Sequence, residues 1–419
     1  MLPEVDAIIV GLGAMGSATL YQLAKRGVKV LGLEAQPEVA HSMGSSHGLT
    51  RIIRLAYFEH PAYVPLLQRS YALWRDLEAE SGKDILKTTG CLDCAPPARQ
   101  ASVGTLQGQL TCFEGSLLAA KQHGLVHEVL TGKQANARFP GYCLPEDFQV
   151  LYQPEGGYLV PERGIEAHVA AAQQHGAQVA CGTRVLGWEP AAAAGSEGAA
   201  GVVVHTEGPG GKRASYWAKK LVMTPGAWLD KLVPEMQGLL QVERQVVGWF
   251  EVEEGRAGDF TPSNFPVFLL QDRNGYYYGF PADAHGFKLG RYHHMREVVD
   301  PDNVPRDITQ ADEQVLRECV DNYFPGAAGK MTRASACMFT NTPDGHFILD
   351  LHPRHPQVVL ASACSGHGYK FASVVGEILA QLALEGRTQH DIGFLRLDAD
   401  RKGHAEFLQR CSGPSRSSL

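Results

Sequence analysis

The strongest constraint on the fold lies near the N-terminus, where the sequence GLGAMG spans residues 11–16. Apolar residues predict a strand at 6–10 before this segment, and a periodic run predicts an amphipathic helix at 15–26 after it. A second predicted strand, 28–33, ends at Glu34. In such a unit the glycines permit a tight turn and bring a pyrophosphate close to the helix N-terminus. The sequence therefore predicts a Rossmann-type, dinucleotide-binding βαβ unit.

The surroundings of the glycine pattern strengthen this prediction. The chain has 46 glycines, so a match could arise by chance, but strand, helix and acidic residue all agree. Glu34 follows about 20 residues on, where its carboxylate can accept hydrogen bonds from ribose hydroxyls and disfavours a 2′-phosphate. The expected nucleotide contacts are Gly11, Gly13, Ala14, Met15, Gly16 and Glu34. This pattern alone does not separate NAD from FAD.

The composition argues against several classes of protein. With 419 residues, 44% of them hydrophobic, the chain is long enough for two domains and a buried cavity. A net charge of −7 without a Lys/Arg run argues against binding to nucleic acid or to a membrane surface. No window of about 18 apolar residues predicts a membrane span, and the first residues do not read as a signal peptide.

The nine cysteines are scattered and odd in number, which fits reduced thiols in the cytoplasm. Cys91 and Cys94 have CxxC spacing, but no second pair or nearby histidine completes a zinc site, so we expect structural cysteines and no metal. The C-terminal Ser417, Ser418 and Leu419 resemble a peroxisomal address without its basic residue, and a peroxisome stays a weaker alternative.

The rest of the chain alternates strand-like and helical segments. The low-complexity stretch 191–201 predicts a surface hairpin loop between two strands. The segment 219–228, KKLVMTPGAW, predicts a strand and a small-residue turn that return to the nucleotide-binding sheet and cover the cofactor. Near the C-terminus, 356–386 predicts a buried strand, a loop of small residues and a helix.

Three further segments carry a resemblance. HSMGSSHGLTRIIRLAYFEHPAYVPL, CMFTNTPDGHFILD and SACSGHGYKFASVVGEILAQLA resemble the monomeric sarcosine oxidase family of amine-oxidising flavoproteins, which includes N-methyltryptophan and pipecolate oxidases. The resemblance spans nearly the whole chain, with its motifs in family order. It implies FAD as the cofactor, and the matching segments imply further cofactor contacts at Ser46, His47, Thr50, Arg51, Gly366, His367, Gly368 and Lys370.

The predicted fold class is α/β, with a Rossmann-type FAD-binding domain interleaved with a second domain built on a mixed or antiparallel β-sheet. No Pro/Gly/Ser linker divides the chain, so the domains are expected to exchange segments. We place the FAD-binding domain at 1–85, 145–225 and 330–395, the substrate domain at 86–144 and 226–329, and a C-terminal extension at 396–419.

The resemblance also implies a covalent bond, a thioether between the flavin 8α-methyl and a cysteine that matches Cys337. Judged by residue type alone, Cys337 would be a small buried hydrophobic residue. Attachment needs a thiolate, so we expect a positive charge near the sulfur, with His47 and Arg51 as candidates.

By the same resemblance, Arg54 and Lys370 bind a substrate carboxylate, Tyr278 forms a pocket wall, and Lys288 activates oxygen. The family pattern reads lysine, leucine, glycine, tyrosine, histidine, whereas this chain reads KLGRYHH with Arg291 inserted. Either His293 or His294 is then expected to face the substrate, and His293 is favoured. Leu49 occupies a position where the sarcosine enzymes carry aspartate.

The predicted activity is oxidation of the C–N bond of a small secondary amino acid to an imine, with O₂ reduced to H₂O₂. Sarcosine-like N-methyl amino acids and cyclic L-pipecolate or L-proline are the candidate substrates. The alternative is a dehydrogenase that passes electrons to another acceptor. A flavin-binding scaffold without catalysis and an NAD-dependent dehydrogenase are disfavoured, because the implied catalytic positions match and no second GxGxxG is visible. We expect a monomer.

Overall fold

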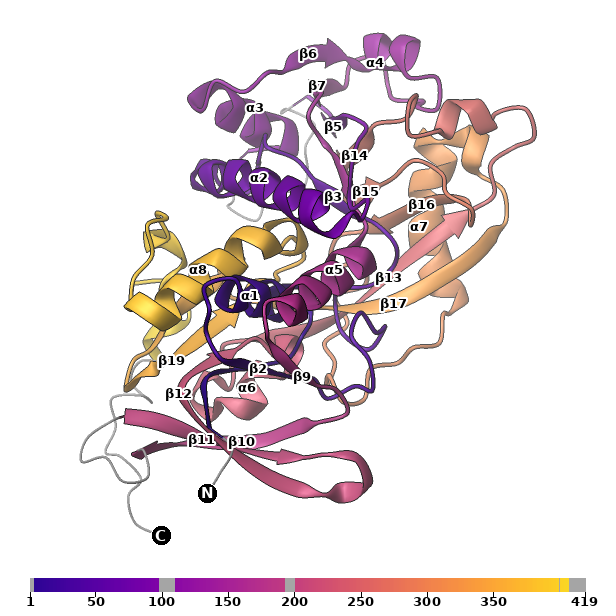
Figure 1. The fold of residues 1–419 in the computed structure, drawn as a ribbon. Helices are drawn as coiled ribbons and strands as arrows, with labels where there is room; N and C mark the ends of the chain where they lie inside the picture. The colour runs from indigo at the N-terminus through magenta and orange to yellow at the C-terminus, as the bar shows by residue number, and fades with distance from the viewer. Residues whose placement is uncertain (1–3, 98–109, 193–199, 399, 407–419) are drawn as a thin grey trace.

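The protein is described here by a computed structural model that covers residues 4–97, 110–192, 200–398 and 400–406. Two large sheets dominate these residues, and helices cover the first sheet on one side (Figure 1). The predicted loop of 191–201 falls largely outside the described residues, although the strands on either side of it do form an antiparallel hairpin. The C-terminal tripeptide also lies outside them.

The first sheet is the nucleotide-binding sheet. Among the described residues its strands are β1 (Glu4–Val10), β2 (Val30–Leu33), β9 (Gln178–Ala180), β10 (Arg184–Ala192), β11 (Ala200–Glu207), β12 (Arg213–Met223), β18 (Ile348–His352) and β19 (His355–Ser362). β1 pairs in parallel with β2 and β12, while β2 pairs with β9 and β12 with β19 in the same sense. The predicted βαβ opening and the return of the chain at β12 are thus confirmed.

Helices pack on this sheet through an apolar and small-residue interface. α1 (Ala14–Ala24) lies against α5 (Pro161–Gln174) and α8 (Ala372–Glu385), and α2 (Val64–Ser81) lies against α8 (Figure 1). The approach of α8 to α1 requires a glycine, because a Cβ on Gly376 would meet the backbone carbonyl carbon of Ala18 at 2.5 Å. The buried residues around these helices form the largest core of the described chain.

The second sheet is mixed and mainly antiparallel, as predicted. Its described order is β17-β13-β16-β15-β14-β5-β7-β6, and only the pair β14–β5 is parallel. The bounds are β5 (Cys91–Ala95), β6 (Glu128–Thr131), β7 (Gln149–Gln153), β13 (Gln241–Phe250), β14 (Val267–Asp272), β15 (Gly275–Gly279), β16 (Phe287–Arg291) and β17 (Met331–Asn341). Its core is rich in phenylalanine.

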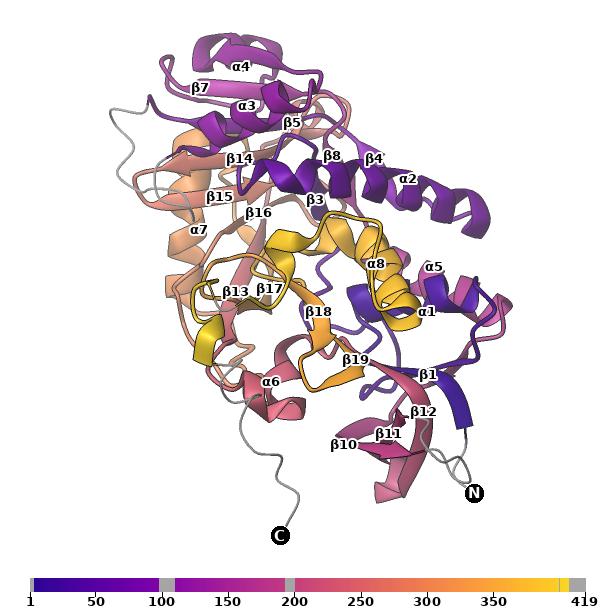
Figure 2. The same cartoon turned by 90° about the vertical axis from the view of Figure 1, so that its left-hand side faces the viewer.

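Smaller elements complete the two layers. A three-stranded sheet consists of β3 (Arg51–Ile53), β8 (Gly157–Leu159) and β4 (Leu86–Thr88). α3 (Cys112–Gln122), α4 (Gly132–Arg138) and α7 (Gln310–Tyr323) belong to the second sheet's side, and Figure 2 shows α3 and α4 at the opposite end of the molecule from β1 and β12. No helix of the described residues is both long and apolar enough to cross a bilayer.

Two strands from segments that the sequence analysis assigned to the FAD-binding domain belong to the second sheet. β7 falls within 145–225 and β17 within 330–395, yet β7 pairs with β5 and β17 pairs with β13 along almost its whole length. An apolar strand pattern shows that a strand forms but not which neighbour it pairs with. The chain therefore passes between the two sheets at more points than the predicted domain boundaries include.

Candidate active site

The glycine turn has the backbone geometry that its residues predict. Gly11 adopts a φ of +84°, and a Cβ on Gly16 would lie 1.8 Å from the Gly11 carbonyl oxygen. Gly13 is the N-cap of α1 and has no side-chain cap within the described residues, and a Cβ on it would come no closer than 4.0 Å to the Ser46 hydroxyl. The free amides of this helix end suit a phosphate.

Glu34 lies at the end of β2, buried, with its carboxylate fixed toward the turn. One oxygen accepts a hydrogen bond from the Leu12 amide at 2.9 Å, and the other accepts one from the Gln36 amide at 2.9 Å. Burial by itself would raise the pKa of Glu34, but hydrogen bonds from His41 and these amides lower it below its ordinary value. The charged carboxylate is thus ready to accept ribose hydroxyls.

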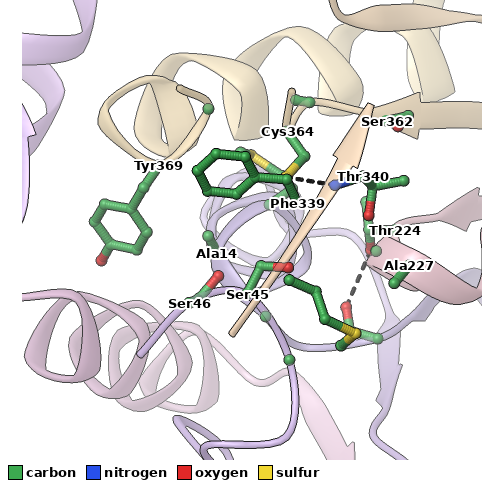
Figure 3. Close-up of a pocket in the computed structure, with 18 of the residues that line it drawn as sticks. Ala14, Ser45, Ser46, Thr224, Ala227, Phe339, Thr340, Ser362, Cys364 and Tyr369 are labelled. Atoms are coloured by element: carbon green, nitrogen blue, oxygen red, sulfur yellow. Dashed lines mark hydrogen bonds between the residues drawn. The ribbon is translucent and has the colours of Figure 1, made fainter. Parts of the chain in front are cut away.

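A cavity of about 550 Å³ extends from this turn to the second sheet. In Figure 3, side chains of Ser46, Thr224, Ala227, Thr340 and Cys364 surround one space, although they come from distant parts of the chain. Of the residues predicted from the sequence, the lining includes Gly11, Gly13, Ala14, Met15, Glu34, Ser46, Arg51, Arg54, Tyr278, Cys337, Gly366, His367, Gly368 and Lys370. The turn at 224–228 also lines it, as the small-residue sequence suggested.

The donor and acceptor set fits FAD. The glycine turn and helix end suit the pyrophosphate, Glu34 suits the adenosine ribose, and the lining continues to Cys337 on β17 in the other sheet. Thr224 belongs to the same wall, where its hydroxyl donates to the Val10 carbonyl at 2.9 Å. The sequence predicted the return of this turn to the sheet, but not the hydrogen bond of the Thr224 hydroxyl, which depends on the pairing of β12 with β1.

Cys337 is buried beside two arginines. Burial raises the pKa of its thiol, whereas the positive charges of Arg51 and Arg306 oppose that rise. His47, the other candidate, is not a cation here, because burial and the nearby Arg51 lower its pKa to about 3. Its Nε2 has no hydrogen-bond partner in the described part of the chain. Arg306, which donates to the Ala336 carbonyl at 3.0 Å, was not found from the sequence.

Lys288 is fully buried on β16 and does not belong to the described lining of the cavity. Its amine donates to the Thr50 carbonyl at 3.0 Å, to the Thr50 hydroxyl at 2.9 Å and to the Gly48 carbonyl. Burial, and then Arg51, lower its pKa well below the ordinary lysine value. Lys288 and Thr50 thus form one unit behind the segment that carries Arg51.

Leu49, at the position of the family aspartate, has a left-handed φ of 71°. The amides of Gly48 and Leu49 both donate to one carboxylate oxygen of Glu162, at 2.7 and 3.1 Å. Glu162 comes from the start of α5, more than a hundred residues away. A carboxylate is therefore present at this loop, but from a different part of the chain.

Arg54 and Lys370 are both buried and both line the cavity. Arg54 donates to Glu59 at 2.8 Å and to the Ala56 carbonyl, and its Nε has no partner among the described residues. The Lys370 amine donates to the His367 carbonyl at 2.8 Å. Burial lowers the pKa of Lys370 to about 7, against the opposing effect of Glu59.

The prediction that a histidine of KLGRYHH faces the site is wrong for this structure. The described lining includes Tyr292 but neither His293 nor His294. His293 instead pairs with Glu243 at 2.8 Å, and His294 pairs with Asp312 at 2.9 Å. Tyr292 lies in the turn that follows β16, where its amide donates to the Tyr276 carbonyl at 2.7 Å.

Tyr278, which the resemblance implies as a pocket wall, lines the cavity from β15, opposite β16. Its pairing partner is Gly290, and a Cβ there would be 2.6 Å from the tyrosine ring and hydroxyl. Phe58, Leu269 and Tyr276 line the same region, and the rings of Phe58 and Tyr276 stack with centroids 5.7 Å apart. Aromatic rings also pack on the two cations: Tyr57 lies against both, Phe58 against Arg54 and Phe371 against Lys370.

Comparisons with known proteins agree with this site. Residues 6–382 match the FAD dependent oxidoreductase family. The chain is 41% identical to monomeric sarcosine oxidase of Bacillus sp. (strain B-0618), over 98% of this chain and 99% of that protein. It is 31% identical to N-methyl-L-tryptophan oxidase of Yersinia pestis (strain Pestoides F), over 94% and 99%.

Among solved structures, NikD, an unusual amino acid oxidase essential for nikkomycin biosynthesis, matches with a TM-score of 0.77 and 25% identity over 94% of this chain and 97% of that one. Glycine oxidase from Geobacillus kaustophilus shares the fold, with a TM-score of 0.72 and 20% identity over 94% and 99%. The predicted family and fold are confirmed. The chain belongs to the FAD-dependent oxidoreductases and, among them, to the monomeric sarcosine oxidase family.

Proposed function

We propose that this chain is an FAD-dependent oxidase of small secondary amino acids, which converts the C–N bond to an imine and reduces O₂ to H₂O₂. Sarcosine-like N-methyl amino acids and the cyclic L-pipecolate and L-proline are the substrates to be tested. When bound, FAD supplies the two-electron acceptor for this chemistry. The relatives named above, which oxidise sarcosine or N-methyl-L-tryptophan according to their names, support this assignment.

The observation that carries the proposal is the pair of buried cations in one cavity wall. Arg54 is 1% exposed and Lys370 is 7% exposed, and both lie among aromatic side chains. A carboxylate removed from water needs charged, directional donors, and the guanidinium provides a fork while the amine provides a point charge. The unpartnered Nε of Arg54 is a donor still available to a ligand.

The other proposed roles follow from position. Tyr278 and Tyr292 would limit the room beside the carboxylate and exclude water from the reacting amine. Lys288, held next to Arg51 and Thr50, would assist the reaction with oxygen as a fixed, buried donor. Cys337 would form the thioether, with Arg51 and Arg306 favouring its thiolate.

The activity can be tested by anaerobic titration of the purified, flavin-containing protein with sarcosine, L-pipecolate, L-proline and other N-methyl amino acids. Bleaching of the flavin spectrum by one class identifies the substrate, and bleaching by none of them contradicts the proposal. Peroxide yield in air, compared with turnover under argon with an artificial acceptor, then separates an oxidase from a dehydrogenase.

The carboxylate site can be tested with Arg54→Leu. Removal of one partner from a buried ion pair costs about 3–5 kcal/mol, so kcat/KM should fall by about two to three orders of magnitude. Arg75→Leu is a matched control, because Arg75 is an arginine paired with Glu78 at the surface, and such pairs contribute little. Equal effects of the two substitutions on the folded proteins would contradict the assigned site.

A further inference from the structure

Asp93 is a buried carboxylate beside the proposed carboxylate site, and the mechanism above does not use it. It lies on β5 and is 2% exposed. One of its oxygens lies 3.7 Å from Nη1 of Arg54 and accepts a hydrogen bond from the Ser116 hydroxyl at 2.5 Å. Asp93 does not belong to the described lining of the cavity, so it contacts Arg54 from behind the wall.

Arg54 therefore has two carboxylate neighbours of different character. Glu59 lines the cavity and accepts a direct hydrogen bond from the guanidinium at 2.8 Å. Burial would raise the pKa of Glu59, but Arg54 lowers it below its ordinary value, so this group stays ionised. Burial raises the pKa of Asp93 to about 6 in spite of Arg54, so Asp93 changes its charge within an accessible pH range.

The groups that face Asp93 come from four elements. Arg54 and Glu59 come from the segment after β3, Cys91 from the same strand, Ser116 and Cys112 from α3, and Lys370 from the short helix η8 (Tyr369–Phe371). Burial raises the pKa of the Cys91 and Cys112 thiols well above the ordinary value, so both are neutral. The charged neighbours of Asp93 are thus Arg54, Glu59 and Lys370, and only Lys370 also titrates near neutral pH.

These four charged groups nearly cancel when all are ionised, because two are cations and two are anions. Protonation of Asp93 leaves one more positive charge than negative in the cluster, which strengthens its attraction for an anionic ligand. The effective dielectric constant near such sites is about 20, so a unit charge about 10 Å away still changes affinity roughly tenfold. The guanidinium of Arg54 need not move for protonation of Asp93 to change the affinity for the ligand.

We propose that Asp93 is a positioning residue of the carboxylate site: it holds Arg54 from behind the cavity wall, and its charge weakens the binding of a carboxylate ligand. This role rests on the proposed function, because it needs Arg54 and Lys370 to be the binding site of an amino acid's carboxylate. It also makes substrate affinity depend on pH through a residue that the ligand does not touch.

The test is the affinity of the flavin-containing protein for 2-furoate, a carboxylate without an amine, measured by isothermal titration calorimetry between pH 5 and 7. The wild-type protein should bind about five- to tenfold more weakly at the upper end than at the lower end, because ionisation of Asp93 opposes binding. In Asp93→Asn the inflection near pH 6 should disappear, leaving only the decline toward pH 7 that the titration of Lys370 causes, and affinity at pH 6 to 7 should exceed that of the wild-type protein.

A second variant keeps the carboxylate and tests the same idea. The hydroxyl of Ser116 stabilises the ionised form of Asp93, so Ser116→Ala should raise the pKa of Asp93 further and move the inflection of the binding profile to higher pH. Asp272→Asn is the matched control: Asp272 is a buried carboxylate on β14 of the same sheet, with a raised pKa, and it is absent from the described lining.

The outcomes separate this inference from the proposed function. If Asp93→Asn and Ser116→Ala both keep the wild-type pH profile, the role of Asp93 is overturned even if the enzyme oxidises secondary amino acids. If the wild-type protein binds no carboxylate and oxidises none of the amino acids, the proposed function fails first. If Asp93→Asn does not fold, the binding profile of Ser116→Ala tests the role of Asp93 by itself. An inflection at higher pH than in the wild-type protein supports that role, and an unchanged inflection overturns it.

Discussion

Lys370 should make the binding of a carboxylate strongly dependent on pH above neutrality. Burial lowers its pKa to about 7, whereas an exposed lysine has a pKa of about 10.4. Above about pH 7 the free amine is mainly neutral, so an anionic ligand must bind together with a proton. If the bound carboxylate restores the ordinary pKa, affinity falls about tenfold per pH unit, or about 2.7 kcal/mol over two units.

Other groups in the cavity wall do not obscure this dependence. Burial lowers the pKa of His367 to about 4 and raises the pKa values of Tyr278 and Tyr292 above that of an exposed tyrosine, so these three remain neutral. Asp93 is already ionised above pH 7. Between pH 7.5 and 9.5 the titration of Lys370 should therefore dominate the binding profile.

The assay is calorimetric titration with 2-furoate in buffers of different ionisation enthalpy, which reports the protons taken up on binding. Near pH 8 about nine-tenths of the free amines are neutral, so uptake should approach about 0.9 proton per ligand bound. In Lys370→Met, uptake should fall close to zero and affinity should become weak and nearly independent of pH. Proton uptake near pH 8 that is unchanged in Lys370→Met would refute the reasoning.

Three further predictions concern the cofactor and the pocket. Cys337→Ser should leave the flavin in the supernatant after acid precipitation, whereas the wild-type pellet should stay yellow; a colourless wild-type pellet would contradict the thioether. Gly16→Ala should abolish flavin binding or soluble expression, because its Cβ would overlap the Gly11 carbonyl oxygen at 1.8 Å, and a normal flavin content would count against the observed turn. Tyr292→Ala should change the KM ratio between cyclic and N-methyl substrates more than His293→Ala does, because Tyr292 lines the cavity and His293 does not. A larger effect of His293→Ala would instead support His293 as the residue that faces the substrate.

Local sequence is sufficient for the nucleotide-binding half of the site. Gly11 has a positive φ that glycine adopts easily, and Gly16 leaves no room for a Cβ beside the Gly11 carbonyl oxygen. Glu34 follows at a distance fixed by one helix and one strand. Interactions inside one βαβ unit involve short separations along the chain. They can therefore be read from spacing, and the structure differs from the prediction only by about two residues at the ends of elements.

The substrate-binding half of the site could be predicted only in part from the sequence. The family motifs placed Arg54, Tyr278 and Lys370 at a pocket, and all three do line the cavity. Neither His293 nor His294 belongs to the described lining, because their rings pair with Glu243 and Asp312. Tyr292, in the turn after β16, lines the cavity instead, and its amide contact with the Tyr276 carbonyl is a tertiary feature that no local pattern encodes.

The sequence by itself determined the dinucleotide turn, the family and the identity of the cations at the site, because these depend on residue type and short spacing. Only the tertiary structure decided that Asp93 lies against Arg54, that Glu162 binds the loop at Leu49, and that β17 brings Cys337 beside Arg306. Each of these contacts joins residues at least thirty positions apart. Burial and the pairing of distant strands bring such residues together, and no local pattern encodes which partner each one meets.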